Sequence, residues 1–278
     1  MPELPEVETI KRSLEKQLVG YKITSLLKFR DSLRYKLDQN IEQKTIGAYI
    51  IKARRVAKYL IFDLNNHNSL IFHFGMTGRL TLRNKEYVFQ KHDHVVFLLE
   101  NETKNMHQLV FNDSRRFGMV YISPTSELLS QKYFSLLGAE PFSDDFNYLY
   151  LKRRFKNRKL PIKLAIMDNK ILVGVGNIYA SESLFLSKIN PLAIAQNLTE
   201  KELNSLLQAI VYVLDKAIDA GGTSLRDFVN GDNKPGYFKQ ELNVYDRQGL
   251  KCHHCQTLIV KIKQSGRATY FCPSCQPL

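Results

Sequence analysis

The first three residues, Met1-Pro2-Glu3, combine residue types that could perform covalent chemistry on a sugar carbon. If Met1 is removed, Pro2 presents a secondary amine with a pKa of about 8, so a neutral nucleophilic fraction exists near neutral pH. Its attack on an aldehyde carbon gives a cationic iminium, which acidifies the neighbouring C–H bond and permits elimination. Glu3 could protonate a leaving group or a ring oxygen. The structural alternative is a helix start, because Pro5 is followed by acidic residues and an apolar stripe.

The cysteines form a second chemical pattern, two Cys-x2-Cys pairs with 16 residues between them: Cys252, Cys255, Cys272 and Cys275. This spacing suits tetrahedral coordination of one Zn²⁺ by four thiolates. Two disulfides are the alternative, which a reducing compartment disfavours. Strand-like runs around Gln264-Ser265-Gly266 predict a hairpin between the pairs. Such a ribbon is too small for a core of its own, so the metal would supply much of its folding free energy. Arg267 follows the turn, where a guanidinium could contact a phosphate.

Three loops carry residues that could contact a nucleic acid. Met76 lies in residues 73–78 and Phe117 in residues 112–118, each beside glycine or arginine. Large apolar side chains are ordinarily core residues, but at a nucleic-acid surface they act as wedges between bases. Gly174-Val175-Gly176-Asn177 is a turn that could offer backbone N–H groups to a phosphate. A tight connection between helices would explain the same turn.

The overall charge favours a polyanionic partner. The chain carries 40 Lys and Arg against 27 Asp and Glu, a net charge of +13, together with 16 Phe and 14 Tyr. This combination indicates nucleic acid before membrane, although a high pI alone would also fit a protein without such a partner. The N-terminus does not resemble a signal peptide, and there is no apolar run of about 18 residues to span a bilayer. We therefore expect a cytoplasmic protein without a membrane partner.

The sequence predicts strands and helices that would position these residues, and together they indicate an α+β fold. Seven runs rich in β-branched and aromatic residues predict a β-sandwich or barrel behind an opening helix: residues 22–29, 45–54, 59–64, 69–74, 94–100, 108–112 and 118–122. Helical segments follow at residues 146–155, 162–167 and 177–187, and a long helix runs from the capping box at residues 199–202 to Gly221-Gly222. We expect a β-sandwich domain over residues 1–123, a linker over 124–143, a helical domain over 144–240 and a zinc ribbon over 241–278.

Several segments, taken together and in order, resemble the formamidopyrimidine-DNA glycosylase family, bacterial base-excision enzymes for oxidised purines. They cover most of the chain: Pro2-Glu3-Leu4-Pro5-Glu6, Ala57-Lys58-Tyr59-Leu60, His73-Phe74-Gly75-Met76-Thr77-Gly78, Lys91-His92-Asp93-His94, Asp113-Ser114-Arg115-Arg116-Phe117-Gly118, residues 173–183, Lys234-Pro235-Gly236-Tyr237-Phe238 and the four-cysteine ribbon with Arg267. The resemblance implies a two-lobed monomer with a helix-two-turn-helix element around residues 173–187, and it implies that duplex DNA containing an oxidised base binds in the cleft.

The resemblance also implies roles for the candidate residues. Pro2 would attack C1′ of the damaged nucleotide with Glu3 as proton donor, and elimination on both sides of the sugar would follow. Lys58 and Arg267 would be the other two catalytic residues, each bound to a DNA phosphate. Asn177 would bind a phosphate together with Arg267. Residues expected to fill the space left by the flipped base, or to make further DNA contacts, are Met76, Arg115, Phe117, His92, Arg158 and Tyr237. Arg158 and Arg226 stand where lysine is more usual, which leaves the contacts at those two positions open.

Two other functions fit parts of the pattern. Endonuclease VIII shares the Pro-Glu start and the ribbon but prefers oxidised pyrimidines, and Leu4 with the Arg115-Arg116-Phe117 segment favours the purine enzyme. A non-catalytic DNA-binding protein could have kept the lobes and the ribbon, but the presence of both Pro2 and Glu3 argues against it.

Overall fold

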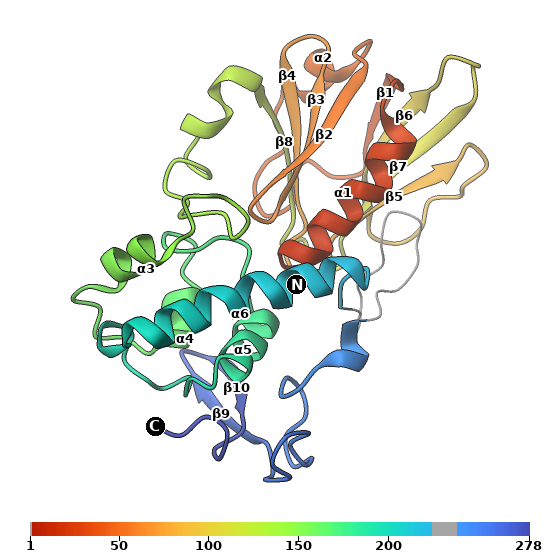
Figure 1. Ribbon diagram of the computed structural model, residues 1–278. Helices are drawn as coiled ribbons and strands as arrows, with labels where there is room; N and C mark the ends of the chain where they lie inside the picture. The colour runs from red at the N-terminus through yellow and green to blue at the C-terminus, as the bar shows by residue number, and fades with distance from the viewer. Residues whose placement is uncertain (1, 224–237) are drawn as a thin grey trace. The chain divides into compact units, whose positions relative to one another are not determined.

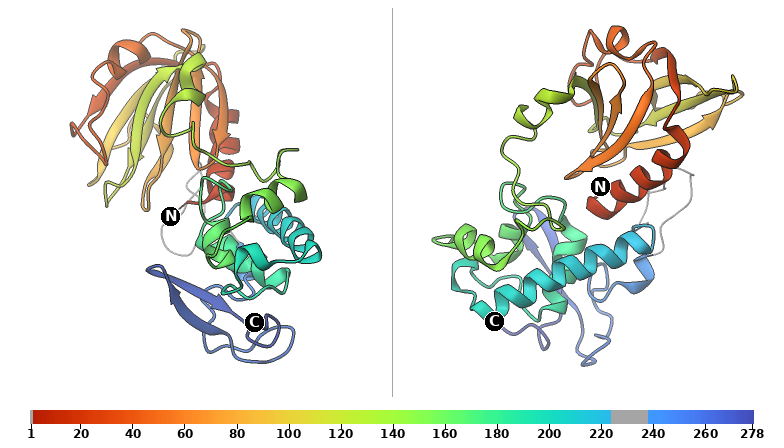
Figure 2. Two further views of the ribbon diagram at one scale, coloured as in Figure 1. Left: turned by 90° about the vertical axis from the view of Figure 1, so that its left-hand side faces the viewer. Right: turned by 45° about the horizontal axis from the view of Figure 1, so that its top comes forward.

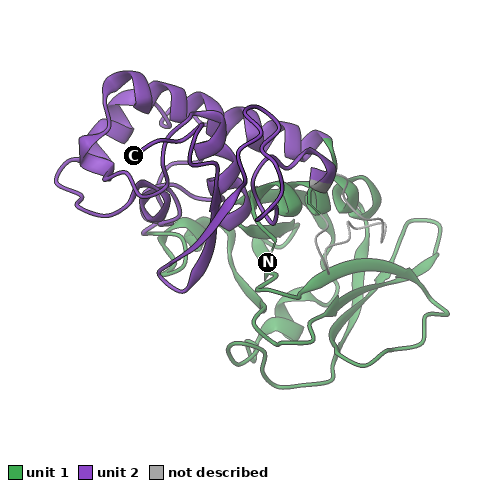
Figure 3. Cartoon of the chain, turned by 90° about the horizontal axis from the view of Figure 1, so that it is seen from below, with its two compact units in different colours: residues 1–135, 220–237 green, residues 136–219, 238–278 purple. Residues whose placement is uncertain are grey.

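The computed structural model describes residues 2–223 and 238–278, and the chain divides into two units (Figures 1 and 3). Unit 1 contains residues 1–135 and 220–237, and unit 2 contains residues 136–219 and 238–278. No helix in the described part of the chain is both long enough and apolar enough to cross a membrane.

Helix α1 (Leu4–Leu18) opens unit 1 and packs its apolar stripe on the sheets. Pro5 lies in the first turn, and Val7, Ile10 and Leu14 are fully or almost fully buried. This is the arrangement expected of an amphipathic helix whose apolar residues recur every three to four positions. The helix contacts strands β2 (Ile50–Val56), β3 (Tyr59–Leu64) and β5 (Arg79–Asn84). The structural role predicted for the segment from Pro5 onward is therefore confirmed.

The rest of unit 1 is a sandwich of two antiparallel sheets. One sheet has the order β1 (Lys22–Lys28), β6 (Asp93–Glu100), β7 (Met106–Asn112) and β5 (Arg79–Asn84). The other has the order β2 (Ile50–Val56), β3 (Tyr59–Leu64), β4 (Asn68–His73) and β8 (Met119–Pro124). A single core joins the inner faces of both sheets to α1, with Phe62, Phe72, Phe97 and Phe111 fully buried in it. The predicted β-sandwich is confirmed.

The structure differs from the sequence predictions at three places in unit 1. Residues 45–54 were predicted as one strand, but Thr45 ends helix α2 (Ile41–Thr45) and the strand starts only at Ile50. Between them Gly47 adopts φ +85°, which breaks extended structure and favours glycine. Strand β5 was not predicted, although Leu80 and Leu82 alternate with polar residues. A 3₁₀ helix, η1 (Thr125–Ser130), lies in the segment that is expected to be a linker.

Unit 2 is built from helices and one hairpin. Its helices are α3 (Tyr148–Phe155), α4 (Ile162–Ile166), α5 (Asn177–Leu186), α6 (Glu200–Asp219) and the 3₁₀ turns η2 (Ala195–Asn197) and η3 (Phe238–Glu241). The predicted capping box of α6 is present, because the Thr199 N–H donates to Glu202 Oε2 at 2.8 Å and the Glu202 N–H donates to Thr199 Oγ1 at 3.3 Å. Strands β9 (Val260–Gln264) and β10 (Arg267–Phe271) form the predicted hairpin, which extends as a two-stranded ribbon (Figure 2).

The ribbon packs on helix α5 within unit 2. Phe185 joins a small core with Val244, Ile259 and Tyr270. The buried carboxylate of Glu182 accepts hydrogen bonds from the backbone N–H groups of residues 243–245, at 2.8 to 2.9 Å. Helix α5 therefore holds the chain at the point where it enters the ribbon.

Candidate nucleic-acid and catalytic site

The N-terminal pair is buried directly before helix α1. Pro2 and Glu3 are both buried, with Glu3 only 3% exposed. The carboxylate of Glu6 accepts from the Glu3 N–H at 2.8 Å through Oε2, and from the Thr223 N–H at 2.8 Å through Oε1. A carboxylate in the first turn is favourable because it satisfies backbone N–H groups that have no partner in the helix. Glu6 thus fixes the backbone that carries the candidate nucleophile and acid.

Lys58 lies in the tight turn between β2 and β3. Val56 pairs with Tyr59 across the hairpin, so Ala57 and Lys58 form a two-residue loop, and Ala57 adopts φ +53°. Loops of this length favour positive φ because it matches the twist of the strands. Lys58 is 8% exposed, which places a cation on a short, constrained loop of unit 1.

His73 is a functional candidate that the sequence analysis missed. It ends strand β4, and its Nδ1 accepts from the Gly75 N–H at 3.2 Å, which places its proton on Nε2. Burial, followed by the charge of nearby Lys58, lowers the pKa of His73 to about 4. The imidazole is therefore a neutral N–H donor beside a lysine. Residues 73–78 were singled out for Met76, and the histidine at the start of the same segment was the available signal.

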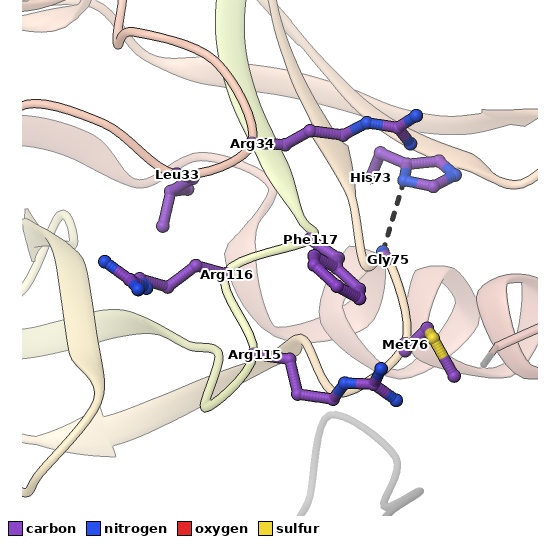
Figure 4. Close-up of a pocket in the computed structure, with 8 residues that line it drawn as sticks. All are labelled: Leu33, Arg34, His73, Gly75, Met76, Arg115, Arg116 and Phe117. Atoms are coloured by element: carbon purple, nitrogen blue, oxygen red, sulfur yellow. Dashed lines mark hydrogen bonds between the residues drawn. The ribbon is translucent and has the colours of Figure 1, made fainter.

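The candidate wedge residues gather at one pocket of about 630 Å³ in unit 1 (Figure 4). Met76 is 41% exposed and Phe117 is 42% exposed, so neither is a core residue. The Arg115 guanidinium carbon lies 4.8 Å from the centre of the Phe117 ring, within cation–π range. Met76, Arg115 and Phe117 lie on one side of the pocket, and Arg116 points the opposite way (Figure 4). The structure thus brings together three predicted residues from two loops.

His92 lies at a smaller pocket of about 390 Å³, also in unit 1. The lining holds three cations, Arg30, Lys91 and Arg116, and one carboxylate, Asp93, whose oxygens already accept three hydrogen bonds within the unit. His92 adopts φ +76°, a conformation that is uncommon outside glycine and is imposed here by the loop before β6. The charges of this lining suit an anion such as a phosphate.

In unit 2, a buried lysine joins Asn177 to the two residues that follow Arg267 in strand β10. Lys163 is 1% exposed and its Nζ donates to Asn177 Oδ1 at 2.6 Å, to Thr269 Oγ1 at 2.7 Å and to Ala268 O at 3.0 Å. Asn177 Nδ2 also donates to Ala268 O at 2.9 Å. One end of helix α5 is therefore tied to strand β10, and Arg267 is exposed at the tip of that strand.

Arg158 and Tyr237 are the two least supported positions. The Arg158 guanidinium lies 3.9 Å from Asp168 Oδ2, so the side chain already faces a carboxylate of its own unit. Tyr237 lies outside the described residues.

The four cysteines form one cluster whose geometry fits zinc. Their sulfur atoms all lie within 4.8 Å of one another, with Sγ–Sγ distances of 3.9 Å for Cys252 and Cys275 and 3.4 Å for Cys255 and Cys272. Thiolates at about 2.3 Å from a tetrahedral Zn²⁺ lie about 3.8 Å apart. The His254 N–H points to Cys252 Sγ at 3.4 Å and stabilises thiolate charge there. The alternative of two disulfides is not seen, since all four cysteines are free thiols.

Comparisons with known proteins agree with this geometry. Residues 1–120 match the formamidopyrimidine-DNA glycosylase N-terminal domain, residues 137–229 its H2TH domain, and residues 249–278 the zinc finger found in FPG and IleRS. The finger match and the cysteine cluster together establish one structural zinc.

Individual relatives match over the full length of the chain. The formamidopyrimidine-DNA glycosylase of Rickettsia bellii is 54% identical over 276 residues, covering 99% of each chain. A variant of Lactococcus lactis FPG solved with Fapy-dG containing DNA has 34% identity and a TM-score of 0.92, covering 100% of both chains. Lactococcus lactis Fpg solved with abasic-site DNA also reaches a TM-score of 0.92 at 34% identity, covering 99% of this chain and 100% of the other. The chain belongs to the formamidopyrimidine-DNA glycosylase family.

Proposed function

We propose that the protein is a bifunctional DNA glycosylase and AP lyase that removes oxidised purines, such as 8-oxoguanine and formamidopyrimidines, in base excision repair. One observation carries this proposal: the chain, which matches a family member over 99% of both chains, has Pro2 and Glu3 buried directly before helix α1. A protein that only bound DNA would not need a secondary amine followed by an acid at this position.

The reaction begins at Pro2 once Met1 has been removed. The Pro2 nitrogen attacks C1′ of the damaged nucleotide, the glycosidic bond breaks, and the base leaves with the proton that the nitrogen gives up. Glu3 then protonates the ring oxygen O4′ as the C1′–O4′ bond breaks, which opens the sugar and leaves C1′ doubly bonded to the Pro2 nitrogen as an iminium. The resulting iminium acidifies the C2′–H bond. Loss of that proton expels the 3′ phosphate, a second elimination expels the 5′ phosphate, and water then hydrolyses the iminium and returns the amine.

The remaining candidate residues hold and distort the DNA. Lys58 and Arg267 neutralise phosphates near the reacting sugar, and Asn177 holds a further phosphate at the start of α5. Met76, Arg115 and Phe117 occupy the space left by the extruded base. His92 contacts the DNA backbone. Arg158 does so too, once its guanidinium leaves Asp168 and binds a phosphate. We add His73 to this set, because its neutral Nε2–H is a donor adjacent to Lys58.

Zinc is structural in this scheme. Cys252, Cys255, Cys272 and Cys275 hold it, and when bound it supplies folding free energy to the ribbon that presents Arg267. We further propose that the protein acts as a monomer on duplex DNA in the cytoplasm. In this scheme residues 1–123 are catalytic, 124–143 are the linker, 144–240 form the helix-two-turn-helix domain and 241–278 form the finger.

Borohydride trapping tests the nucleophile. The protein with Met1 removed should form a covalent adduct on duplex DNA containing 8-oxoguanine, because only an imine or iminium is reduced to a stable amine bond. One extra residue before Pro2 should leave DNA binding intact and abolish trapping. Glu3→Gln should bind DNA but lose base excision, while retaining part of the strand cleavage at a preformed abasic site. Full trapping by the N-terminally extended protein would move the nucleophile elsewhere, with Lys58 the first alternative.

Assays on a panel of DNA substrates distinguish a glycosylase for oxidised purines from one for oxidised pyrimidines. Under this proposal the ratio of kcat/KM for 8-oxoguanine to that for an oxidised pyrimidine exceeds one. The opposite ratio would assign the protein an endonuclease VIII-like preference, and trapping without excision of either base would reduce it to an AP lyase.

A further inference from the structure

Asp113 is a buried carboxylate that joins the two wedge loops of unit 1. Its side chain is fully buried, and Oδ2 accepts from the Gly118 N–H at 2.7 Å. Oδ1 accepts from the Thr77 hydroxyl at 2.5 Å and from the Arg115 N–H at 3.3 Å. The Arg115 N–H also lies 3.1 Å from Thr77 Oγ1. One carboxylate therefore bonds to the loop that carries Met76 and to the loop that carries Phe117.

The same two loops touch through their backbones. A Cβ atom on Gly75 would lie 2.4 Å from the carbonyl carbon of Phe117, and one on Gly118 would lie 2.9 Å from His73 O. Only glycine permits this approach, since real Cβ atoms do not come so close to backbone. The loops are therefore packed without intervening side chains, and the Asp113 bonds lie at this junction.

The second loop is also anchored to the sheet. The His94 side chain lies with Nε2 2.8 Å from Asp113 O, and the Asp113 N–H donates to His92 O at 3.0 Å. Both contacts connect the loop to strand β6 and the residues just before it. Asp113 therefore connects the loop that carries Phe117 to the sandwich. Thr77 connects the loop that carries Met76 to the same aspartate.

We propose that Asp113 and Thr77 are positioning residues that couple the two loops into one rigid wedge, so that Met76 and Phe117 enter the duplex together. This inference rests on the proposed function. Unstacking a base costs free energy, so the base stack resists insertion of a side chain, and a loop that yields under that resistance extrudes the base less often. Neither positioning residue touches DNA; both act through the two exposed side chains. The coupling therefore affects base extrusion and not the chemistry at C1′.

Two substitutions of Thr77 isolate this hydrogen bond. Thr77→Val keeps the shape of the side chain but removes the hydroxyl, and Thr77→Ser keeps the hydroxyl as a matched control. Thr77→Val should slow extrusion about tenfold, the order expected when a hydrogen bond to a charged group is lost. The measurement is the fluorescence of 2-aminopurine beside 8-oxoguanine, followed by stopped flow. Cleavage of a preformed abasic site should change less than about twofold, because no intact base must be extruded, and Thr77→Ser should behave as the wild type on both substrates.

Hydrogen exchange on the DNA-free protein provides a readout that does not depend on activity. In Thr77→Val the amides of Arg115 and Gly118 should exchange faster, whereas those of strand β7 should not change. Thr77→Ala serves as a second variant if valine lowers the melting temperature. Wild-type exchange at both amides, or equal losses on 8-oxoguanine and abasic substrates, would overturn the coupling. If instead the wild-type protein neither excises 8-oxoguanine nor traps on it, the proposed function fails, whatever the exchange data show.

A double-mutant cycle provides the final test. Met76→Ala and Phe117→Ala should have non-additive effects on extrusion in the wild type, because the two side chains act as one body. In the Thr77→Val background their effects should become additive. Additive effects in both backgrounds would show that the loops act independently and would contradict the inference.

Discussion

Arg55 and Glu8 form an ion pair, Nε to Oε2 at 3.1 Å, that joins strand β2 to helix α1. The same guanidinium donates from Nη1 to Ala57 O at 2.9 Å. The side chains are only 10% and 15% exposed, so the pair is weakly screened by solvent. It connects the helix that follows Pro2-Glu3 to the two-residue loop that carries Lys58. The placement of Lys58 therefore depends on Arg55.

Replacing Arg55 should reduce lyase chemistry more than it reduces DNA affinity. In Arg55→Gln the Glu8 carboxylate keeps Arg12 at 3.0 Å but loses its largely buried partner, which should cost about 1–3 kcal/mol of unfolding free energy and loosen the Lys58 loop. Urea unfolding measures the stability, fluorescence anisotropy measures the DNA affinity, and the borohydride trapping rate on an abasic duplex measures the lyase chemistry. Arg54→Gln is the matched control, because Arg54 lies next to Arg55 on β2 and pairs with Asp63 of β3 at 2.7 Å, away from the loop. Equal trapping losses in both variants would remove the special role of Arg55.

His73 should make stability depend on pH in a known direction. Its folded pKa of about 4 lies below the ordinary 6.5, first because of burial and then because of Lys58. Between these two values the unfolded chain binds more protons, so unfolding free energy should fall as pH falls from 6.5 to about 4, by at most about 3 kcal/mol. His73→Gln should flatten this part of the urea-unfolding profile.

The charge of Lys58 can be tested at the same histidine. Lys58→Met removes a nearby positive charge and should raise the pKa of His73, while burial keeps it below the ordinary value. An NMR titration of the ring protons measures the change. A wild-type His73 that titrated at its ordinary pKa would show that the ring is not buried as described.

Zinc removal should unfold the ribbon and weaken DNA binding together. Cys272→Ser leaves three thiolates, so bound zinc should fall and Arg267 should lose its fixed position. Zinc content by atomic emission and DNA affinity by fluorescence anisotropy are the measurements, with Ser274→Ala in the same knuckle as the control. Stoichiometric zinc with unchanged affinity in Cys272→Ser would contradict the prediction.

Arg267 should contribute to affinity without regard to base sequence. Arg267→Ala should weaken binding to damaged and undamaged duplexes alike, and should reduce the magnitude of the log–log salt slope by about 0.9, the value for one phosphate contact. Lys104→Ala is a suitable control, because that exposed lysine pairs with Glu100 on the sandwich. An unchanged slope in Arg267→Ala would mean that the guanidinium remains solvated in the complex.

Local features of this protein could be predicted from sequence because they depend on residues a few positions apart. The capping box of α6, the hairpin of the ribbon and the cysteine pairs each satisfy their hydrogen bonds or metal ligands within a short stretch of chain. The opening helix and most strands follow from apolar periodicity in the same way. The start of β2 was predicted too early, because β-branched residues at 45–46 suggested extended structure where Thr45 completes a helical turn.

Long-range contacts decided the rest, because they pair residues that no local pattern connects. Arg55 and Glu8 are 47 positions apart, and Thr77 and Asp113 are 36 apart. The low pKa of His73 arises from burial and from the charge of Lys58 on a neighbouring hairpin. Exposure of Met76 and Phe117, which distinguishes a wedge from a core residue, depends on how two loops pack at the end of the sandwich. By itself the sequence therefore determined the chemical groups and their local elements, whereas tertiary packing decided the partners, burial and protonation of those groups.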